Sequence, residues 1–169
     1  MAVREILQLG NPNLYRKSTE VDESGLDDIK IVIDDLHDTI MDFRGRYNFG
    51  RAIAAPQIGV FKRVIYMHIG TSIPIINPRL VEMSDEMIEV WDNCMSFPDL
   101  LVKVRRHARG KILYRDPDWN EQSLVLGGDL AELLQHEYDH LDGILATQRA
   151  IDGKSFALKS EIDKIDRSA

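Results

Sequence analysis

One stretch near the end of the sequence, LLQHEYDHLDG at residues 133–143, restricts the fold more than any other. It places His136 and His140 four positions apart in a segment where leucines recur at helical spacing. The leucines are Leu130, Leu133, Leu134 and Leu141. Residues i and i+4 lie on one face of an α-helix, about one turn apart, so both imidazoles can point at one place. The helix, expected from Gly127/Gly128 to Gly143, must therefore turn this face toward other ligands inside the protein.

The HExxH spacing is typical of a metal site in which two histidines bind the ion and the glutamate acts as a base. Glu137 lies roughly 100° around the helix from His136, so its carboxylate can take a proton from water beside the ion. In the other interpretation, hydrogen bonds in the core satisfy both histidines, and Glu137 then needs a separate explanation. The metal interpretation is therefore favoured.

The third ligand separates the enzyme classes that share this spacing. The pattern HExxHxxGxxH needs a third histidine where the sequence has Ala146, so that class is excluded. Glu161 is one candidate, as in endoproteases that take a glutamate from a later helix. The other candidate is Cys94, the only cysteine, because a thiolate binds divalent metals strongly. A lone cysteine is otherwise often a small buried apolar residue, so its neighbourhood must decide.

The rest of the chain contains a second helical pattern and several short β-rich segments. Apolar residues three and four positions apart predict a helix from about Leu26 to Arg44, which RGRYNFG then breaks. An extended arm and loop are expected over residues 1–24, and a short helix or frayed tail over 154–164. Strands are expected at FKRVIYMHI, PIINPRLVEM, MIEVWDN, LLVKVRR and KILYRDPD. The expected fold class is α+β, with mixed, largely antiparallel sheets around the C-terminal metal-binding helix.

The 169 residues are expected to form one domain over 1–169, since no repeat or linker divides them. No apolar run is long enough to cross a membrane, and Arg4 and Glu5 stand where a signal peptide needs an apolar core. The net charge of −7 gives no general attraction to DNA or anionic membranes. The basic run RRHARGK, at 105–111, is expected to be a solvated strand face. We therefore expect a cytoplasmic monomer with neither DNA nor a membrane as partner.

Three stretches resemble the motifs of the peptide deformylase family, in the same order and at similar spacing. GRAIAAPQIG, residues 50–59, is similar to Gly-x-Gly-x-Ala-Ala-Pro-Gln-x-Gly. DNCMS, residues 92–96, is similar to Glu-Gly-Cys-x-Ser. QHEYDHLDG, residues 135–143, is similar to Gln-His-Glu-x-Asp-His-Leu-x-Gly. The chain is therefore identified as a member of this family, on motifs that cover its middle and its end.

The resemblance implies a metal-dependent amidohydrolase that removes the N-formyl group from peptides beginning with formylmethionine. It implies one divalent ion, Fe²⁺ in most members and Zn²⁺ or Ni²⁺ in others. The implied ligands are Cys94, His136 and His140. Glu137 would be the base, and the oxyanion donors would be the side-chain amide of Gln57 and the backbone N–H of Met95. Nascent chains at the ribosome are an implied source of substrate. Because the sequence retains the three implied ligands, Glu137 and Gln57, the alternative of a non-catalytic metal-binding or peptide-binding relative is disfavoured.

Two charged residues have expected roles outside the ligand set. Arg106 matches an arginine that in the family pairs with the acid of the second motif, so an Arg106–Asp92 ion pair is expected. Two roles stay open for Asp139, which lies within HEYDH: it orients a histidine, or it faces solvent.

The surroundings of the expected site depart from the family pattern. Ala52 stands where the family has glycine, and Arg51 where it usually has an aliphatic residue. A methyl group at Ala52 can crowd the substrate chain. The second motif has Asn93 in place of glycine, and asparagine tolerates a positive φ, so Asn93 is expected to keep the backbone shape.

On the C-terminal helix, Glu132 and Asp129 lie four and seven residues before His136, at positions that are mostly apolar in the family. If these acids line the pocket, with Arg51 as partner, the pocket prefers something more polar than methionine, and the substrate is a different N-formyl or N-acyl compound. If they turn to solvent at the helix start, methionine is expected. The expected substrate-binding residues are Gly50, Arg51, Ala52, Asp129, Glu132 and Leu133.

Overall fold

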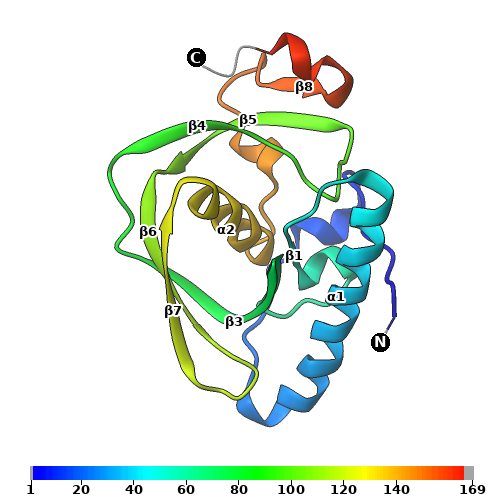
Figure 1. Cartoon of the computed structure of the whole chain (residues 1–169), viewed down its shortest axis with the longest axis vertical. Coiled ribbons are helices and arrows are strands. Elements are labelled where there is room, and N and C mark those ends of the chain that lie inside the picture. Colours follow the sequence, from blue (N-terminus) through cyan, green and yellow to red (C-terminus); the bar gives the residue numbers. More distant parts are fainter. Residues whose placement is uncertain (1, 166–169) are drawn as a thin grey trace.

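The computed structural model describes residues 2–165, so both ends of the expected range 1–169 lie outside the described part. Within that part, two α-helices and eight strands are joined by loops and short 3-10 helices (Figure 1). The strands form a five-stranded sheet, in the order β1-β2-β3-β6-β7, and a three-stranded sheet, in the order β4-β5-β8. All neighbouring strands within these sheets run antiparallel, as expected.

The elements have the following bounds. The helices are α1 (Leu26–Tyr47) and α2 (Gly128–Leu141). The strands of the larger sheet are β1 (Ala52–Ala54), β2 (Val64–Ile69), β3 (Thr71–Val81), β6 (Arg109–Arg115) and β7 (Glu121–Gly127). The strands of the smaller sheet are β4 (Met87–Asp92), β5 (Leu100–His107) and β8 (Phe156–Leu158). The 3-10 helices are Pro12–Tyr15, Glu23–Gly25, Ala55–Ile58, Ala146–Arg149 and Lys159–Lys164.

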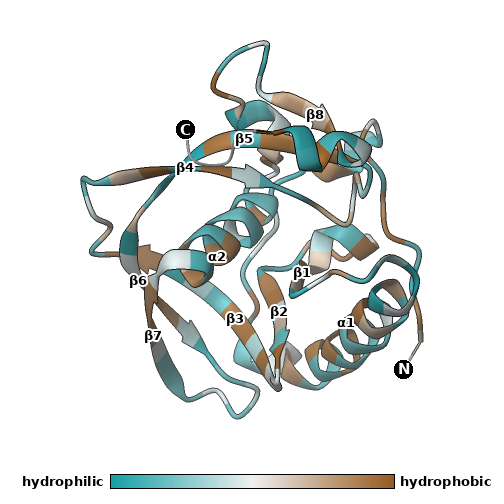
Figure 2. Cartoon of the chain, turned by 45° about the horizontal axis from the view of Figure 1, so that its top comes forward, coloured by the Kyte–Doolittle hydropathy of each residue, from teal (hydrophilic) through white to brown (hydrophobic). Residues whose placement is uncertain are grey.

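The helix α2 lies at the centre, with strands of both sheets around it, and α1 lies on the other side of β1 and β2 (Figures 1 and 2). The sequence of β2 explains this arrangement. Val64 and Tyr66 are buried with residues of α1, whereas Ile65 and Met67 are buried with residues of α2. Successive residues of a strand point to opposite faces, so a strand with a helix on each side is apolar throughout.

The helix α1 is longer than expected, because it continues through Gly45 to Tyr47. The Tyr47 ring stacks on that of Phe43, with ring centroids 4.4 Å apart. The residue after the helix, Asn48, caps it: its backbone is left-handed (φ 59°) and its N–H donates to the carbonyl of Arg44. A glycine inside a helix costs about 1 kcal/mol, which the ring stacking offsets. The expected end at Arg44 is therefore wrong.

The five expected strands are present as β2, β3, β4, β5 and β6. The structure also contains β1, β7 and β8, which were not expected. The strand β7 forms a sheet edge with little apolar signal, because its first three residues are polar and Val125 is exposed. Of the two forms expected for the segment 154–164, the short helix is present in part, as the 3-10 helix Lys159–Lys164. The strand β8, which precedes it and pairs with β5, was not expected. The expected arm at 1–24 contains two short 3-10 helices.

The N-terminal segment is fastened to α1 through the buried carboxylate of Asp35. Its Oδ1 accepts a hydrogen bond from the Ala2 N–H at 2.7 Å, and its Oδ2 accepts one from Arg4 Nε at 2.8 Å. Burial raises the pKa of Asp35, but these hydrogen bonds and the charge of Arg4 outweigh it, so its pKa lies below the usual value.

We expect Asp35→Asn to lower the free energy of unfolding by about 1.5 kcal/mol at pH 7. A carboxyl whose folded pKa is depressed stabilises the fold above its unfolded pKa and loses that contribution as the pH falls through the folded pKa. The difference between wild type and variant should therefore shrink below about pH 4. Urea unfolding at several pH values measures it, with the exposed neighbour Asp34→Asn as control. A difference that stays constant down to low pH would contradict this account.

Candidate metal centre

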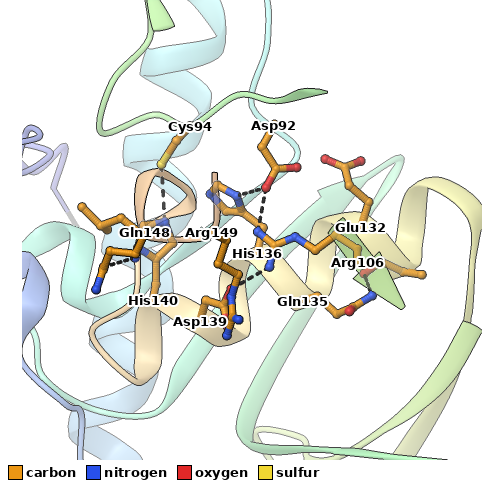
Figure 3. A network of polar contacts seen from close by, with 12 residues as sticks. Asp92, Cys94, Arg106, Glu132, Gln135, His136, Asp139, His140, Gln148 and Arg149 are labelled. Carbon is orange, nitrogen blue, oxygen red and sulfur yellow. Dashed lines mark hydrogen bonds and ion pairs between the residues drawn. The ribbon is translucent and has the colours of Figure 1, made fainter. Parts of the chain in front are cut away.

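The three expected ligands lie close together between α2 and the loop that follows β4. They are Cys94, His136 and His140. All three are buried, and their ligand atoms lie within 4.8 Å of one another. The Sγ of Cys94 is 3.4 Å from Nε2 of His140 (Figure 3). Two ligand atoms bound to one tetrahedral ion at 2.3 and 2.0 Å lie roughly 3.5 Å apart, so the spacing suits a single divalent ion.

The sulfur of Cys94 is surrounded by hydrogen-bond donors. The backbone N–H of Ser96 lies 3.5 Å from Sγ, and the amide Nε2 of Gln57 lies 3.6 Å from it. These contacts hold the sulfur in position, and the thiolate is the form of a cysteine that binds metal. One thiolate and two imidazoles suit Zn²⁺, Fe²⁺ or Ni²⁺, and a set of three ligands leaves a fourth position open for water. The residues present therefore fit a catalytic metal ion.

The carboxylate of Asp92, at the end of β4, holds His136 in place. Its Oδ2 accepts hydrogen bonds from His136 Nδ1 at 3.0 Å and from Arg106 Nη2 at 2.6 Å (Figure 3). Because Nδ1 is engaged, Nε2 of His136 is left to bind the ion. Burial raises the pKa of Asp92, but the hydrogen bond from His136 and the charge of Arg106 lower it far below the usual value. Asp92 therefore stays ionised, in the ion pair expected from the sequence.

Of the two roles left open for Asp139, the solvent-facing one is excluded, and Asp139 acts on a histidine only through other residues. It is buried, and its carboxylate accepts hydrogen bonds from Arg106 Nη1 at 2.6 Å and from Arg149 Nε at 2.6 Å. A third bond, from Arg149 Nη2 to Oδ1, is 2.8 Å long. Asp139 thus holds Arg106, which holds Asp92, which holds His136 (Figure 3). No motif in the sequence marks Arg149 as part of this chain of contacts.

Replacing Arg106 by leucine should lower the free energy of unfolding by about 3–5 kcal/mol, because two buried carboxylates lose the cation that they share. Asp92 then keeps its contact with His136, and Asp139 keeps its contact with Arg149. The matched control is Arg105→Leu, whose side chain is 60% exposed, against 3% for Arg106, and pairs with Glu89 on the surface. That variant should cost less than about 1 kcal/mol. Urea unfolding of both variants measures the contrast, and equal losses would contradict it.

The difference in exposure between Arg105 and Arg106 also corrects the expectation that the run RRHARGK is a solvated strand face. Arg105 and Arg109 are exposed, but Arg106 and Ala108 are buried. The alternation of a strand turns every second residue of this run inward.

Glu137 stands beside His136 on α2 and is buried in the wall of a cavity. Among the described residues, nothing donates a hydrogen bond to its Oε2. Burial raises the pKa of Glu137 to about 7, with the nearby His136 lowering it and Asp92 raising it. A buried carboxyl oxygen without a hydrogen-bond donor is costly for the fold, and this is the expected condition of a group that exchanges protons with a bound molecule.

The cavity has a volume of about 260 Å³, and Cys94, Met95, His136 and Glu137 all line it. The other lining residues that were expected are Gly50, Arg51, Ala52, Glu132 and Leu133. Gln57 lies behind the wall, where its Oε1 accepts from the Ala54 N–H at 2.9 Å and its Nε2 donates to Ser96 Oγ at 3.1 Å. Asn48 and Phe49 also line the cavity. Sequence analysis missed them, because they belong to no motif and follow a helix that was expected to end earlier.

The two acids of α2 that precede the metal ligands, Asp129 and Glu132, differ in position. Glu132 lines the cavity and pairs with Arg51, as expected, at 3.4 Å between Oε2 and Nη2. Burial and the neighbouring Asp92 raise the pKa of Glu132 to about 7, while Arg51 lowers it. Asp129 is exposed in the first turn and does not line the cavity, so that expectation is wrong. One more helical turn separates it from the ligands, and an acid at a helix start is stable in water.

Two other expectations also fail. Among the described residues, Asn48, Asn77, Glu82 and Trp119 are the non-glycine residues with positive φ, so Asn93 does not reproduce a left-handed glycine. Glu161 is exposed and pairs with Lys164 at 2.8 Å, so it is not the third ligand.

Known proteins resemble this chain over most of its length. A family model described as polypeptide deformylase matches residues 3–156. Peptide deformylase 1 of Prochlorococcus marinus is 37% identical over 175 residues, which cover 96% of this chain and 88% of that protein. The crystal structure of peptide deformylase from Thermotoga maritima has a TM-score of 0.81 at 28% identity, over 90% of this chain and 100% of that one. A Met-Ala-Ser-bound peptide deformylase from Acinetobacter baumannii has a TM-score of 0.79 at 28% identity, over 88% and 98%.

Proposed function

The chain belongs to the polypeptide deformylase family, and we propose that it removes the N-formyl group from N-formylmethionyl peptides with one divalent metal ion. The proposed ligands are Cys94, His136 and His140. The observation that supports this proposal most is that these three ligands and Glu137, whose Oε2 has no hydrogen-bond partner in the described part of the chain, line or adjoin the same cavity. We take Fe²⁺ as the native ion, with Zn²⁺ or Ni²⁺ as substitutes that the same donor atoms can hold.

A bound divalent ion supplies Lewis acidity, which makes water a better nucleophile and polarises the formyl oxygen. The protein residues carry the proton and the developing charge. Glu137 takes a proton from the water whose oxygen attacks the formyl carbon, and returns it to the amine nitrogen as the C–N bond breaks. The products are formate and a peptide with a free amino terminus.

The formyl oxygen gains negative charge during this attack and needs hydrogen-bond donors. We assign this role to the Gln57 side-chain amide and the Met95 backbone N–H. Two contacts support the assignment: Gln57 Nε2 lies 3.6 Å from Cys94 Sγ, and Met95 follows Cys94 in the cavity wall. The bond from the Ala54 N–H to Oε1 orients the Gln57 amide so that its nitrogen faces the sulfur.

The peptide is proposed to lie against the wall formed by Gly50, Arg51, Ala52, Glu132 and Leu133. A Met-Ala-Ser peptide bound to the relative from Acinetobacter baumannii supports a peptide as ligand here. We further propose that nascent chains at the ribosome, in the cytoplasm, are the source of substrate, and that the chain acts as a monomer with one domain over residues 1–169.

Formate release from formyl-Met-Ala-Ser tests the function. Protein purified anaerobically with Fe²⁺, or loaded with Ni²⁺, should give kcat/KM on the order of 10⁴ M⁻¹s⁻¹ or above. A chelator should abolish the activity, and acetyl-Met-Ala-Ser should not replace the formyl peptide. Protein with one ion per chain that releases no formate would refute the proposal.

A further inference from the structure

The position of Glu132 bears on which N-formyl peptides fit the site. Glu132 and Leu133 lie one helical turn before His136 and Glu137 on α2, and all four residues line the cavity. A turn advances an α-helix by about 5.4 Å. A peptide whose formyl carbon lies beside Glu137 therefore has its first side chain within reach of Glu132, one turn away.

The carboxyl of Glu132 is largely withdrawn from water but weakly paired. Its side chain is 14% exposed, and its contact with Arg51 is a single long one of 3.4 Å. Arg51 is 40% exposed, so water can replace this contact on the arginine side. The carboxyl of Asp92 is the other close neighbour: it repels an ionised Glu132 and accepts a hydrogen bond from a protonated one (Figure 3). The end of the cavity at Glu132 therefore has two acidic groups with one partly exposed arginine beside them.

An apolar first side chain would remove the remaining water from Glu132 and give it no hydrogen bond, which is unfavourable for a carboxyl. A side chain with N–H groups would supply the bond and would complement the two neighbouring carboxyls. The wall contains both kinds of group that such a side chain needs: Leu133 and Phe49 offer apolar surface for methylene groups, and Asn48 and Glu132 offer polar atoms.

Resting on the deformylase function proposed above, we propose that Glu132 selects N-formyl peptides whose first side chain carries N–H donors, an amide or an ammonium group. Peptides that begin with formylmethionine remain substrates, but poorer ones.

The test is to measure kcat/KM for the peptides formyl-X-Ala-Ser, in which X is lysine, glutamine, methionine or norleucine. Norleucine is included because it has the length of methionine but no polar atom. Wild type should favour lysine and glutamine over norleucine. In Glu132→Leu, the ratio of lysine to norleucine should fall about tenfold to a hundredfold, since the bond to a charged partner is lost. Glu132→Gln, which keeps the shape, should lose the lysine preference and retain part of the glutamine preference.

Asp129→Leu is the matched control, because it makes a similar acid-to-leucine change on the same helix outside the cavity, and its ratios should equal those of wild type. If Glu132→Leu does not fold, as judged by circular dichroism, the loss of lysine preference in Glu132→Gln decides. A wild-type preference for methionine and norleucine that survives in these variants would overturn the inference and leave the deformylase function intact. Absence of formate from every peptide, at full metal content, would overturn both.

Discussion

Replacing Glu137 by glutamine is expected to lower kcat for formyl-peptide hydrolysis by about 10³- to 10⁴-fold while the metal content stays unchanged. Glutamine keeps the shape of the side chain but cannot take a proton from water or return it to the leaving amine. Because nothing among the described residues donates to Oε2 of Glu137, the variant should be no less stable than wild type. A loss of activity without a loss of stability or metal would identify a catalytic group.

Formate release, metal content and urea unfolding measured on one preparation separate these effects. The control is Glu161→Gln, an exposed glutamate at the end of the chain that pairs with Lys164, and it should retain wild-type kcat. This control also tests the endoprotease alternative, in which Glu161 would be a ligand. If Glu137→Gln keeps more than about a tenth of wild-type kcat, Glu137 is not the principal base.

The metal-binding half of the site could be predicted from the sequence because its geometry is local. The spacing of His136 and His140 determines their common face on any helix, and Glu137 follows from the same spacing. Cys94 was less certain, because a lone cysteine is compatible with an inert core position. Only the packing of the loop after β4 against α2 brings its sulfur to 3.4 Å from His140 Nε2.

The supporting contacts could not be predicted, since they join segments that are distant in the sequence. Asp139 was expected to orient a histidine or to face solvent, but no pattern in the sequence indicates its partners, which are Arg106 from β5 and Arg149 from a later turn. Periodicity also failed to separate Glu132 from Asp129, which share one stripe of α2. The part of α2 that lines the cavity begins at Glu132, one turn before His136, and Arg51 and Ala52 from a distant part of the sequence line the same cavity.

Replacing Cys94 by alanine should weaken metal binding by at least about 10²-fold, because it removes one of three ligands, and losses outside the ligand set already cost 10- to 100-fold. The fold should persist, since Cys94 is a small buried side chain and alanine is the closest smaller residue. Under the alternative in which Glu161 is the third ligand, Cys94→Ala would retain its metal.

Metal content after gel filtration distinguishes these outcomes: about one ion per chain is expected for wild type and almost none for Cys94→Ala. Because Cys94 is the only cysteine, its alkylation by iodoacetamide gives an independent measure in the wild-type protein. A thiolate that binds an ion is a poor nucleophile, so the alkylation rate should rise when a chelator removes the metal. A rate that does not respond to the chelator, together with metal retained by Cys94→Ala, would place the ion away from this sulfur.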